Sequence, residues 1–440
     1  MKESEILLTL KAKHGIEELN EMQKKILSQS TTSGDMIILS PTGSGKTIAF
    51  LLPILKSLKP FSGKVQVVII APSRELVTQI DSVARSLAVG YKTTCCYGGH
   101  SVIDEKQSLA ITPDIIVGTP GRLLDHINRK NIDLLSTRFL ILDEFDKSLE
   151  LGFQEEMQKI VKRMPNLSRR ILTSATSINE MPEFVGLQSA TTYNFLQGNA
   201  SLRDRLTVWE VKSTSNDKLE MLLMLLNNVK EGRTIVFANH REAVERIYDY
   251  LMDNYMPAGM YHGGLEQIDR EKALSMFNNG TYRVLVTTDL GSRGLDIAEV
   301  TNIIHYHLPS SSETYTHRNG RSARVNATGE IYVITSPTEK IPAYIVFDGE
   351  KDIDENAVSL LKKTMTTLYF QAGKKEKISR GDIVGFLVNQ GGLQSDEIGQ
   401  IDLKDHYTLV AIPALKTEEI LDRIATQKIK NKRVRISVTF

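Results

Sequence analysis

The feature that most constrains the fold is an alternation of short, β-branched apolar runs with helical patterns. These runs occupy residues 36–39, 67–70, 115–117, 139–142, 170–172, 234–237, 283–286, 303–305 and 330–334. Runs of this kind are typical of strands buried on both faces, and the helical stretches between them supply the crossovers of parallel sheets. The sequence therefore predicts an α/β fold of parallel sheets flanked by helices.

The chain also carries a faint internal repeat. A glycine pair stands after a strand and before a helix in YGGHSVIDEKQSL, from Tyr97, and in YHGGLEQIDREKAL, from Tyr261. Each copy is followed by an apolar strand and a matching loop, VGTPGRLLD ending at Asp125 and VTTDLGSRGLD ending at Asp296. Two matches in the same order predict two duplicated α/β domains, with a boundary near residues 198–204.

A third, smaller segment is expected after the charged run 373–377. Apolar runs at 383–388, 398–403 and 409–412 precede a predicted helix over 417–427, with Thr417 as its N-cap, and a last strand over 434–438. The order β, α, β, β, α, β fits this segment. That order is the pattern of the RNA-recognition module, a four-stranded sheet that displays one face to RNA.

Residues 40–47, SPTGSGKT, follow a predicted strand and open a predicted helix over 47–55. This is the context of a loop that cradles phosphates on backbone N–H groups, and it is the predicted ATP site. The residues assigned to it are Ser40, Thr42, Gly43, Ser44, Gly45, Lys46 and Thr47. Lys46 would supply charge to the outer phosphates and the Thr47 hydroxyl would ligate Mg²⁺. The alternative is a glycine-rich helix-entry turn with a solvated lysine.

Three carboxylates follow the apolar run 139–142, at Asp143, Glu144 and Asp146. A strand end beside a phosphate loop is where Mg²⁺ must be held, so Asp143 is the predicted metal residue. Glu144 is the candidate to orient and deprotonate the attacking water. Acidic residues that merely solvate a loop or cap a helix are the alternative.

The second half of the chain supplies the basic segment 317–324, HRNGRSAR. Arg321 and Arg324 lie three residues apart and would face one way if the segment is helical. Cations that reach the terminal phosphate from a second domain would stabilise transition-state charge and make hydrolysis depend on both domains. A solvated basic helix is the alternative.

Residues 40–47, 143–146, 174–176 and 317–324, taken together and in this order, resemble the DEAD-box RNA helicases, over roughly residues 15–336. The resemblance implies two tandem RecA-like domains, residues 1–203 and 204–366, with ATP as cofactor and RNA as partner. It implies that Gln23 reads adenine, that Asp296 holds the ribose, and that Asp146, Ser174, Thr176 and His317 couple the ATP site to RNA.

The same resemblance implies an RNA backbone track across both halves. Its residues are Pro72, Arg74, Gly99, Thr119, Arg122, Arg270 and Thr288. Contacts confined to phosphates and sugars read no sequence, and a bent strand cannot remain in a duplex. The implied activity is therefore RNA-stimulated ATP hydrolysis with local separation of short RNA duplexes.

Two stretches depart from the family pattern. Phe145 stands where the family has alanine, so its ring must be packed and its coupling to Ser174 can be altered. Residues 19–22 replace the usual Pro-Thr-Pro-Ile character before Gln23, which bears on adenine discrimination. Two other hypotheses stay open: an ATP-gated RNA clamp in which Phe145 slows hydrolysis, and a helicase directed to DNA.

Residues 367–440 form the expected third domain. They resemble the RNA-recognition module of DbpA-type helicases at 373–377, 381–383, 396–402 and 428–434, which implies a ribosomal RNA target in the large subunit. Tyr407 and His406 are the residues here that could stack bases. The basic cluster 428–435 could grip phosphate, with a solvated strand as the alternative. A module that serves only protein contacts is a further alternative.

Composition sets the remaining expectations. The formal net charge is +1, so attraction to RNA must come from local basic surface. The amino terminus makes a poor signal peptide, and no run approaches membrane-spanning length. Adjacent Cys95 and Cys96 are expected to be two buried thiols without a disulfide or a metal. A cytoplasmic monomer with no membrane partner is expected.

Overall fold

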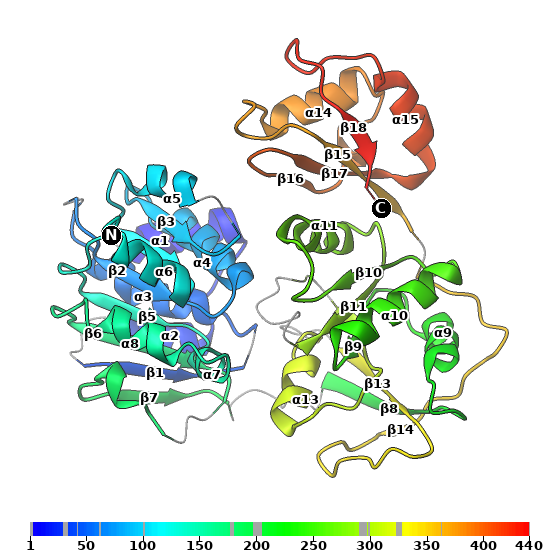
Figure 1. Cartoon of the computed structure of the whole chain (residues 1–440), viewed down its shortest axis with the longest axis horizontal. Helices are drawn as coiled ribbons and strands as arrows, with labels where there is room; N and C mark the ends of the chain where they lie inside the picture. Colours follow the sequence, from blue (N-terminus) through cyan, green and yellow to red (C-terminus); the bar gives the residue numbers. More distant parts are fainter. Residues whose placement is uncertain are drawn as a thin grey trace. The chain divides into compact units, whose positions relative to one another are not determined.

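The computed structural model describes residues 3–29, 34–41, 43–60, 63–99, 102–176, 180–196, 205–289, 297, 300–322, 328–361 and 363–439. The chain divides into two compact units, the first within residues 1–201 and the second within 202–440 (Figure 1). The second unit contains both a large parallel sheet and a small antiparallel one.

The first unit is built on a seven-stranded sheet in which every pairing is parallel. Its strands are β1 (Met36–Leu39), β2 (Val67–Ile70), β3 (Thr93–Cys96), β4 (Ile115–Gly118), β5 (Phe139–Leu142), β6 (Arg169–Ser174) and β7 (Thr191–Asn194). The order across the sheet is β3-β4-β2-β5-β6-β1-β7. All carboxyl ends of these strands therefore lie along one edge, where loops can combine residues from distant parts of the sequence.

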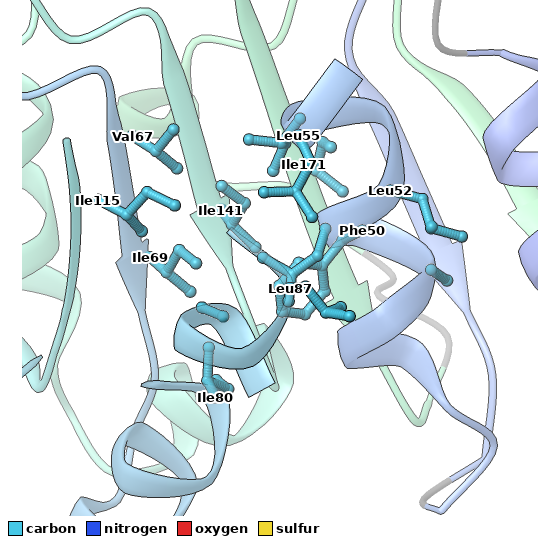
Figure 2. Close-up of a cluster of buried hydrophobic side chains, with 14 of the residues drawn as sticks. Phe50, Leu52, Leu55, Val67, Ile69, Ile80, Leu87, Ile115, Ile141 and Ile171 are labelled. Carbon is cyan, nitrogen blue, oxygen red and sulfur yellow. The ribbon is translucent and has the colours of Figure 1, made fainter. Parts of the chain in front are cut away.

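Helices cover both faces of this sheet. They are α1 (Glu3–His14), α2 (Glu21–Ser28), α3 (Lys46–Ser57), α4 (Arg74–Leu87), α5 (Val102–Leu109), α6 (Pro120–Asn128), α7 (Phe145–Glu150) and α8 (Gln154–Val161), with a 3₁₀ turn at Glu183–Val185. Alternate strand residues enter different cores: Val67 and Ile69 pack with α3 and α4, whereas Val68 and Ile70 pack on the opposite side. Figure 2 shows part of the first core, where Phe50 of α3 is buried in the same cluster as Ile141. Burial on both faces explains the continuous apolar runs.

The second unit repeats the same plan. Its parallel strands are β8 (Leu206–Lys212), β9 (Arg233–Ala238), β10 (Ala258–Tyr261), β11 (Val284–Thr288), β12 (Val300–His305), β13 (Gly329–Thr335) and β14 (Gly349–Glu350), in the order β10-β11-β9-β12-β13-β8-β14. Its helices are α9 (Leu219–Asn228), α10 (Arg241–Asp253), α11 (Gln267–Asn278) and α13 (Ser312–Asn319). With β10 matched to β3, the two orders are the same permutation, which confirms the predicted duplication.

The third segment is a four-stranded antiparallel sheet in the order β16-β17-β15-β18. Its elements are β15 (Met365–Phe370), α14 (Arg380–Asn389), β16 (Ile401–Leu403), β17 (Thr408–Pro413), α15 (Thr417–Ile424) and β18 (Ile436–Val438). The predicted order β, α, β, β, α, β is confirmed, although the first strand precedes residue 373 and the run 383–388 belongs to α14. Thr417 is not an N-cap: Lys416 holds that position, and the Thr417 hydroxyl donates to the Ala414 carbonyl at 2.9 Å.

The predicted fold class is confirmed: two parallel-sheet α/β domains followed by a small α+β domain. Both cysteines are free, with Cys96 buried and Cys95 half-buried. Burial raises the pKa of the Cys95 thiol to about 12, so it stays protonated. Among the described helices, none combines the length and the apolar character needed to cross a membrane.

Candidate functional site

The loop between β1 and α3 has the geometry of a phosphate cradle. Gly43 and Gly45 have φ of 75° and 87°, in the left-handed region where glycine is at ease. The Lys46 ammonium turns back into the loop and donates to the carbonyls of Ser40 and Pro41, at 2.7 and 3.1 Å. The loop therefore surrounds its own lysine and aims the amino end of α3 outward. Thr42 lies outside the described residues.

Gln23, the predicted adenine reader, lies against this loop. Its side-chain amide donates to the Gly45 carbonyl at 3.3 Å, and it forms a reciprocal capping box with Asn20 at the start of α2. Asn20 in turn donates to the Ser44 carbonyl at 2.9 Å. A Cβ at Gly45 would stand 2.5 Å from the Gln23 amide nitrogen, so only glycine permits this approach. The cap of α2 and the phosphate loop thus form one structure.

Asp143 directly follows β5, interacts with the charge of Lys46 in the loop and is only 2% exposed. The Thr173 hydroxyl donates a short hydrogen bond to one of its carboxylate oxygens. Burial raises the pKa of Asp143, and the Thr173 hydrogen bond and the charge of Lys46 oppose that rise. A carboxylate and the hydroxyl of Thr47, the second residue of α3, are hard oxygen ligands of the kind Mg²⁺ takes.

Glu144 follows with φ of 45°, an unusual left-handed conformation for a residue with a side chain. Its N–H donates to the Thr173 hydroxyl at 3.2 Å, so Thr173 holds Asp143 and Glu144 together. Such strain is found at functional sites, where the surroundings enforce it.

The predicted coupling residues of the first unit are in contact. The Thr176 hydroxyl donates to Asp146 at 2.8 Å, and the Thr176 N–H donates to the Ser174 hydroxyl at 3.0 Å. Ser174 ends β6, and its carbonyl accepts from the Ser40 N–H at 3.0 Å. Asp146, Thr176 and Ser174 therefore connect the acidic strand end to the phosphate loop.

Phe145 points away from these contacts. It is fully buried in the core beneath β5, with its ring centroid 6.4 Å from that of Phe184. The expectation that the ring must be packed is confirmed. Its neighbours Glu144 and Asp146 keep their polar contacts because the ring occupies the opposite side of the chain at this point.

The predicted RNA residues of the first unit gather at the ends of β2, β3 and β4. Pro72 and Arg74 follow β2, and the Arg74 guanidinium lies against Gly98, where a Cβ would stand 3.3 Å from it. Gly99, with φ of 91°, follows β3. Thr119 is the N-cap residue of α6, one residue after β4.

Arg122, on the first turn of α6, is paired with buried Glu105 of α5 at 3.4 Å. Glu105 also contacts the imidazole of His126 at 2.7 Å and accepts from the Tyr97 N–H at 3.0 Å. Cys96 has its sulfur within 4.8 Å of Glu105 and His126, but burial raises the pKa of this thiol strongly. We interpret this cluster as one that holds the Arg122 side chain in place. Its partner Glu105 was not predicted from the sequence.

In the second unit, Arg270 stands on α11 and Thr288 ends β11, the counterparts of helix α5 and strand β4. The Arg270 guanidinium donates to the carbonyls of Gly263 and Leu265, at 2.6 and 3.2 Å, across the glycine pair. Thr288 thus stands at the end of the strand that matches β4, which Thr119 follows in the first unit, and Arg270 contacts the loop after β10, which matches the loop of Gly99 after β3.

The basic segment departs from the prediction. Helix α13 contains His317 but ends at Asn319, so Arg321 lies in the turn after the helix and is 6% exposed. The prediction that Arg321 and Arg324 face one way required a helical segment, and residues 320–322 do not meet this condition because α13 ends at Asn319. Arg324 and Asp296 lie outside the described residues.

Arg318 was not assigned a role from the sequence, and it is the largest fully buried side chain in the described part of the chain. Its guanidinium donates to both oxygens of Asp289 at 2.6 and 2.8 Å, and to Asn239 at 2.7 Å. It therefore ties α13 to the ends of β9 and β11. The sequence does show Arg318 as a third arginine of the segment 317–324, but it does not show that this side chain is buried.

In the small domain, Tyr407 stacks on Tyr369 of β15, with centroids 5.5 Å apart. The Tyr407 hydroxyl donates to Glu271 of α11 at 2.6 Å, and Lys272 lies 5.3 Å from the Tyr369 ring centroid. Tyr369 was not predicted from the sequence, because the strands of this domain were expected to begin after residue 373. His406 is exposed and contacts Glu376 at 3.1 Å.

The sheet order sorts these residues into two groups. In the first unit the phosphate loop follows β1, the acidic residues follow β5 and the predicted coupling residue Ser174 ends β6, and these three strands are neighbours. The predicted RNA residues of this unit follow β3, β4 and β2, which are also neighbours. One edge of one sheet thus carries both groups side by side. A phosphate loop followed by acidic strand ends, in the first of two RecA-like domains, defines a nucleoside-triphosphatase.

Comparison with known families narrows this class. The model "DEAD/DEAH box helicase" matches residues 20–184, "Helicase conserved C-terminal domain" matches 217–326, and "DbpA RNA binding domain" matches 367–438. The chain therefore belongs to the DEAD-box ATP-dependent RNA helicases and carries a DbpA-type RNA-binding domain. The expected ATP-dependent RNA helicase activity is thereby confirmed at the level of the family.

Relatives of similar length exist. The chain is 29% identical to the ATP-dependent RNA helicase DbpA of Bacillus subtilis, over 96% of this chain and 95% of that protein. It is 30% identical to DbpA of Escherichia coli, over 95% and 94%. Among solved structures, it is similar to S. cerevisiae Dbp5 bound to RNA and ADP BeF3, with a TM-score of 0.68 and 26% identity over 76% of this chain and 88% of the other.

Proposed function

We propose that the chain hydrolyses ATP with Mg²⁺ when RNA is bound and uses the cycle to separate short duplexes in ribosomal RNA of the large subunit. The observation that carries this proposal is the edge of the first sheet. There the phosphate loop and acidic residues stand beside the predicted RNA track, on neighbouring strand ends. RNA and nucleotide would therefore bind to neighbouring strand ends of the same sheet.

Within that site each side chain has a proposed task. The loop N–H groups and Lys46 bind the phosphates, and Thr47 and Asp143 hold Mg²⁺, which supplies charge compensation when bound. Glu144 accepts the proton of the attacking water and orients it. Arg321 and Arg324 supply positive charge from the second unit, which makes the reaction depend on both units.

Coupling to RNA is proposed to run through Asp146, Thr176 and Ser174. Their hydrogen bonds of 2.8 and 3.0 Å link the acidic strand end to the end of β6. The track residues proposed to bind RNA backbone follow β2, β3 and β4, beside this group. Binding of a single strand through phosphates and sugars would favour its separation from a complementary strand without reading sequence.

The small domain is proposed to direct the helicase units to structured ribosomal RNA. Support comes from its match to the DbpA RNA-binding model and from full-length similarity to two DbpA helicases. Lys428, Lys430, Lys432, Arg433 and Arg435 follow its second helix as a basic run that could contact phosphates. A monomer is proposed, since all the functional groups invoked come from one chain.

The alternative of an ATP-gated RNA clamp rested on Phe145. Its ring is packed into the core while the Asp146–Thr176 hydrogen bond is intact, an arrangement that favours turnover over a blocked cycle. The alternative of a DNA-directed helicase is distinguished from the proposal by comparing RNA with DNA in the assay below.

The test is steady-state ATPase activity titrated with ribosomal RNA fragments and with DNA of matched sequence. RNA should stimulate turnover more than DNA, and Glu144→Gln should abolish it while RNA binding persists. Glu155→Gln removes an exposed carboxylate of α8 and is the matched control, with unchanged activity expected. Turnover that ignores RNA, or that survives Glu144→Gln, would overturn the proposal.

A further inference from the structure

The sheet of the small domain has one face without helices of its own. Leu368 and Phe370 of β15 point into the core with α14 and α15, so Thr367 and Tyr369 occupy the opposite face. On that face the register places Tyr369 beside Ser437 of β18. Helix α11 of the neighbouring parallel-sheet domain lies against part of this face and leaves the strip along β15 and β18 open.

A hollow of about 380 Å³ lies along that strip. Its lining includes Lys272 of α11, Tyr369 of β15, Gln371 just after β15, and Arg435, Ser437 and Thr439 in and around β18. The volume falls in the range of about 300–1,000 Å³ in which small-ligand sites occur. Among the described residues that line this hollow none is a carboxylate, and the charged ones are the cations Lys272 and Arg435.

An unsatisfied donor points to a polar occupant. Thr439 is 8% exposed, and its hydroxyl is buried without a hydrogen-bond partner. A buried hydroxyl without a hydrogen-bond partner is unfavourable, so a ligand that accepts or donates a hydrogen bond there would be favoured. Ser437 and Gln371 are exposed at the same strip and add a hydroxyl and an amide.

The aromatic ring of this hollow is already engaged. Tyr369 is stacked on Tyr407 at 5.5 Å, and the Lys272 ammonium lies 5.3 Å from its centroid. Base stacking on Tyr369 would have to displace one of these contacts. The hydroxyls, the amide and the two cations instead match a phosphate with an attached ribose, whose 2′-hydroxyl both donates and accepts.

The hollow exists only while the small domain is docked on α11. Hydrogen bonds hold it there: Tyr407 to Glu271 at 2.6 Å, Ser275 to Asp402 at 2.5 Å and Asn279 to Thr367 at 2.8 Å. Lys404 adds an ion pair with Glu271 at 3.0 Å. Docking therefore brings Lys272 next to the sheet of the small domain. The ion pair of Lys272 with exposed Asp269 is long, at 3.6 Å.

We infer that this hollow is a composite site for one phosphate–ribose unit of an RNA strand, completed by Lys272 from the helicase half. The inference rests on the proposed function for the identity of the ligand as RNA. Since α11 also carries Arg270 of the proposed RNA track, RNA in the hollow stabilises docking and holds this helix against the module.

The test measures binding of a single-stranded RNA to the full chain without nucleotide, as a function of salt. One phosphate contact contributes about 0.7–0.9 to the salt slope, or about five- to eightfold in affinity at 0.1 M salt. Lys272→Gln and Arg435→Gln should each produce that loss. Thr439→Val should reduce the preference for RNA over matched DNA, because it removes only the hydroxyl.

Two further variants keep the inference falsifiable. Arg423→Gln removes a cation from α15, on the helical side of the module, and should leave affinity and salt slope unchanged. Glu271→Gln combined with Tyr407→Phe should weaken docking of the small domain and lower RNA affinity as much as Lys272→Gln does. Adding Lys272→Gln to this double variant should then lower the affinity no further. An unchanged salt slope in Lys272→Gln overturns the composite site. So does a triple variant whose loss of RNA affinity is the full sum of the losses of Lys272→Gln and of the double variant. These binding results do not depend on ATP turnover, so failure of the ATPase proposal would be seen separately.

Discussion

Replacement of Phe145 by alanine should destabilise the first unit strongly and leave its chemistry intact. The ring is 0% exposed and packs near Phe184, so its removal leaves a cavity in a closed core. Loss of a buried phenyl ring costs about 3–5 kcal/mol, against a total of about 5–15 kcal/mol for a domain. For a unit of about 200 residues each kcal/mol shifts the melting midpoint by about 2–4 °C, so a fall of about 6–20 °C is expected.

The chain contains its own control for this measurement. Its one tryptophan, Trp209, lies on β8 of the second unit, so tryptophan emission follows that unit. In Phe145→Ala the far-ultraviolet circular dichroism should gain an earlier transition, while the emission midpoint stays fixed. ATPase activity per folded molecule, measured well below the midpoint, should persist because Thr176 still donates to Asp146. Unchanged unfolding of both units, or lost turnover in folded protein, would refute the reasoning.

Three other changes give distinct results. Thr176→Ala removes the 2.8 Å hydrogen bond to Asp146 and should lower RNA stimulation of the ATPase, with nucleotide affinity retained in a direct binding assay. Thr173→Val removes the donor that opposes the raised pKa of Asp143. Because the carboxylate form is required, the acid limb of the ATPase pH profile should move to higher pH; movement to lower pH would contradict this role. Burial lowers the pKa of His305 to about 3, so it is neutral when folded and protonates on unfolding below about pH 6.5. Stability of the second unit should therefore be full above pH 6.5 and fall below it, by up to about 1.4 kcal/mol per pH unit, in urea titrations followed by tryptophan emission at pH 7.5 and 5.5.

Strands that carry a continuous apolar run could be predicted from the sequence, and strands without one could not. Strands such as β2 and β5 are buried on both faces and read as continuous apolar runs. By contrast, β7 has the sequence TTYN and is mostly exposed, and β8 alternates apolar with polar residues. Pairing with a neighbour, rather than local composition, makes these segments strands.

The candidate site was predictable where it depends on local sequence. The phosphate loop needs glycines and a lysine at fixed spacing between a strand and a helix, and the structure has them there. The partners that hold the site come from elsewhere in the chain: Glu105 beneath Arg122, and Asp289 against Arg318. Spacing cannot reveal such pairs, because they depend on which strand ends become neighbours.

The shared strand order also explains why one unit alone should not hydrolyse ATP. In the first unit, β1 leads into the phosphate loop and β5 into Asp143. Their counterparts by sheet position, β8 and β12, lead into Ser213-Thr-Ser-Asn and into the turn before α13, with neither a phosphate loop nor an acidic strand end. Past α13 the second unit instead offers Arg321. The same fold thus presents the groups proposed to bind phosphate and metal in one copy and an arginine in the other. Chemistry that requires both sets of groups requires both copies.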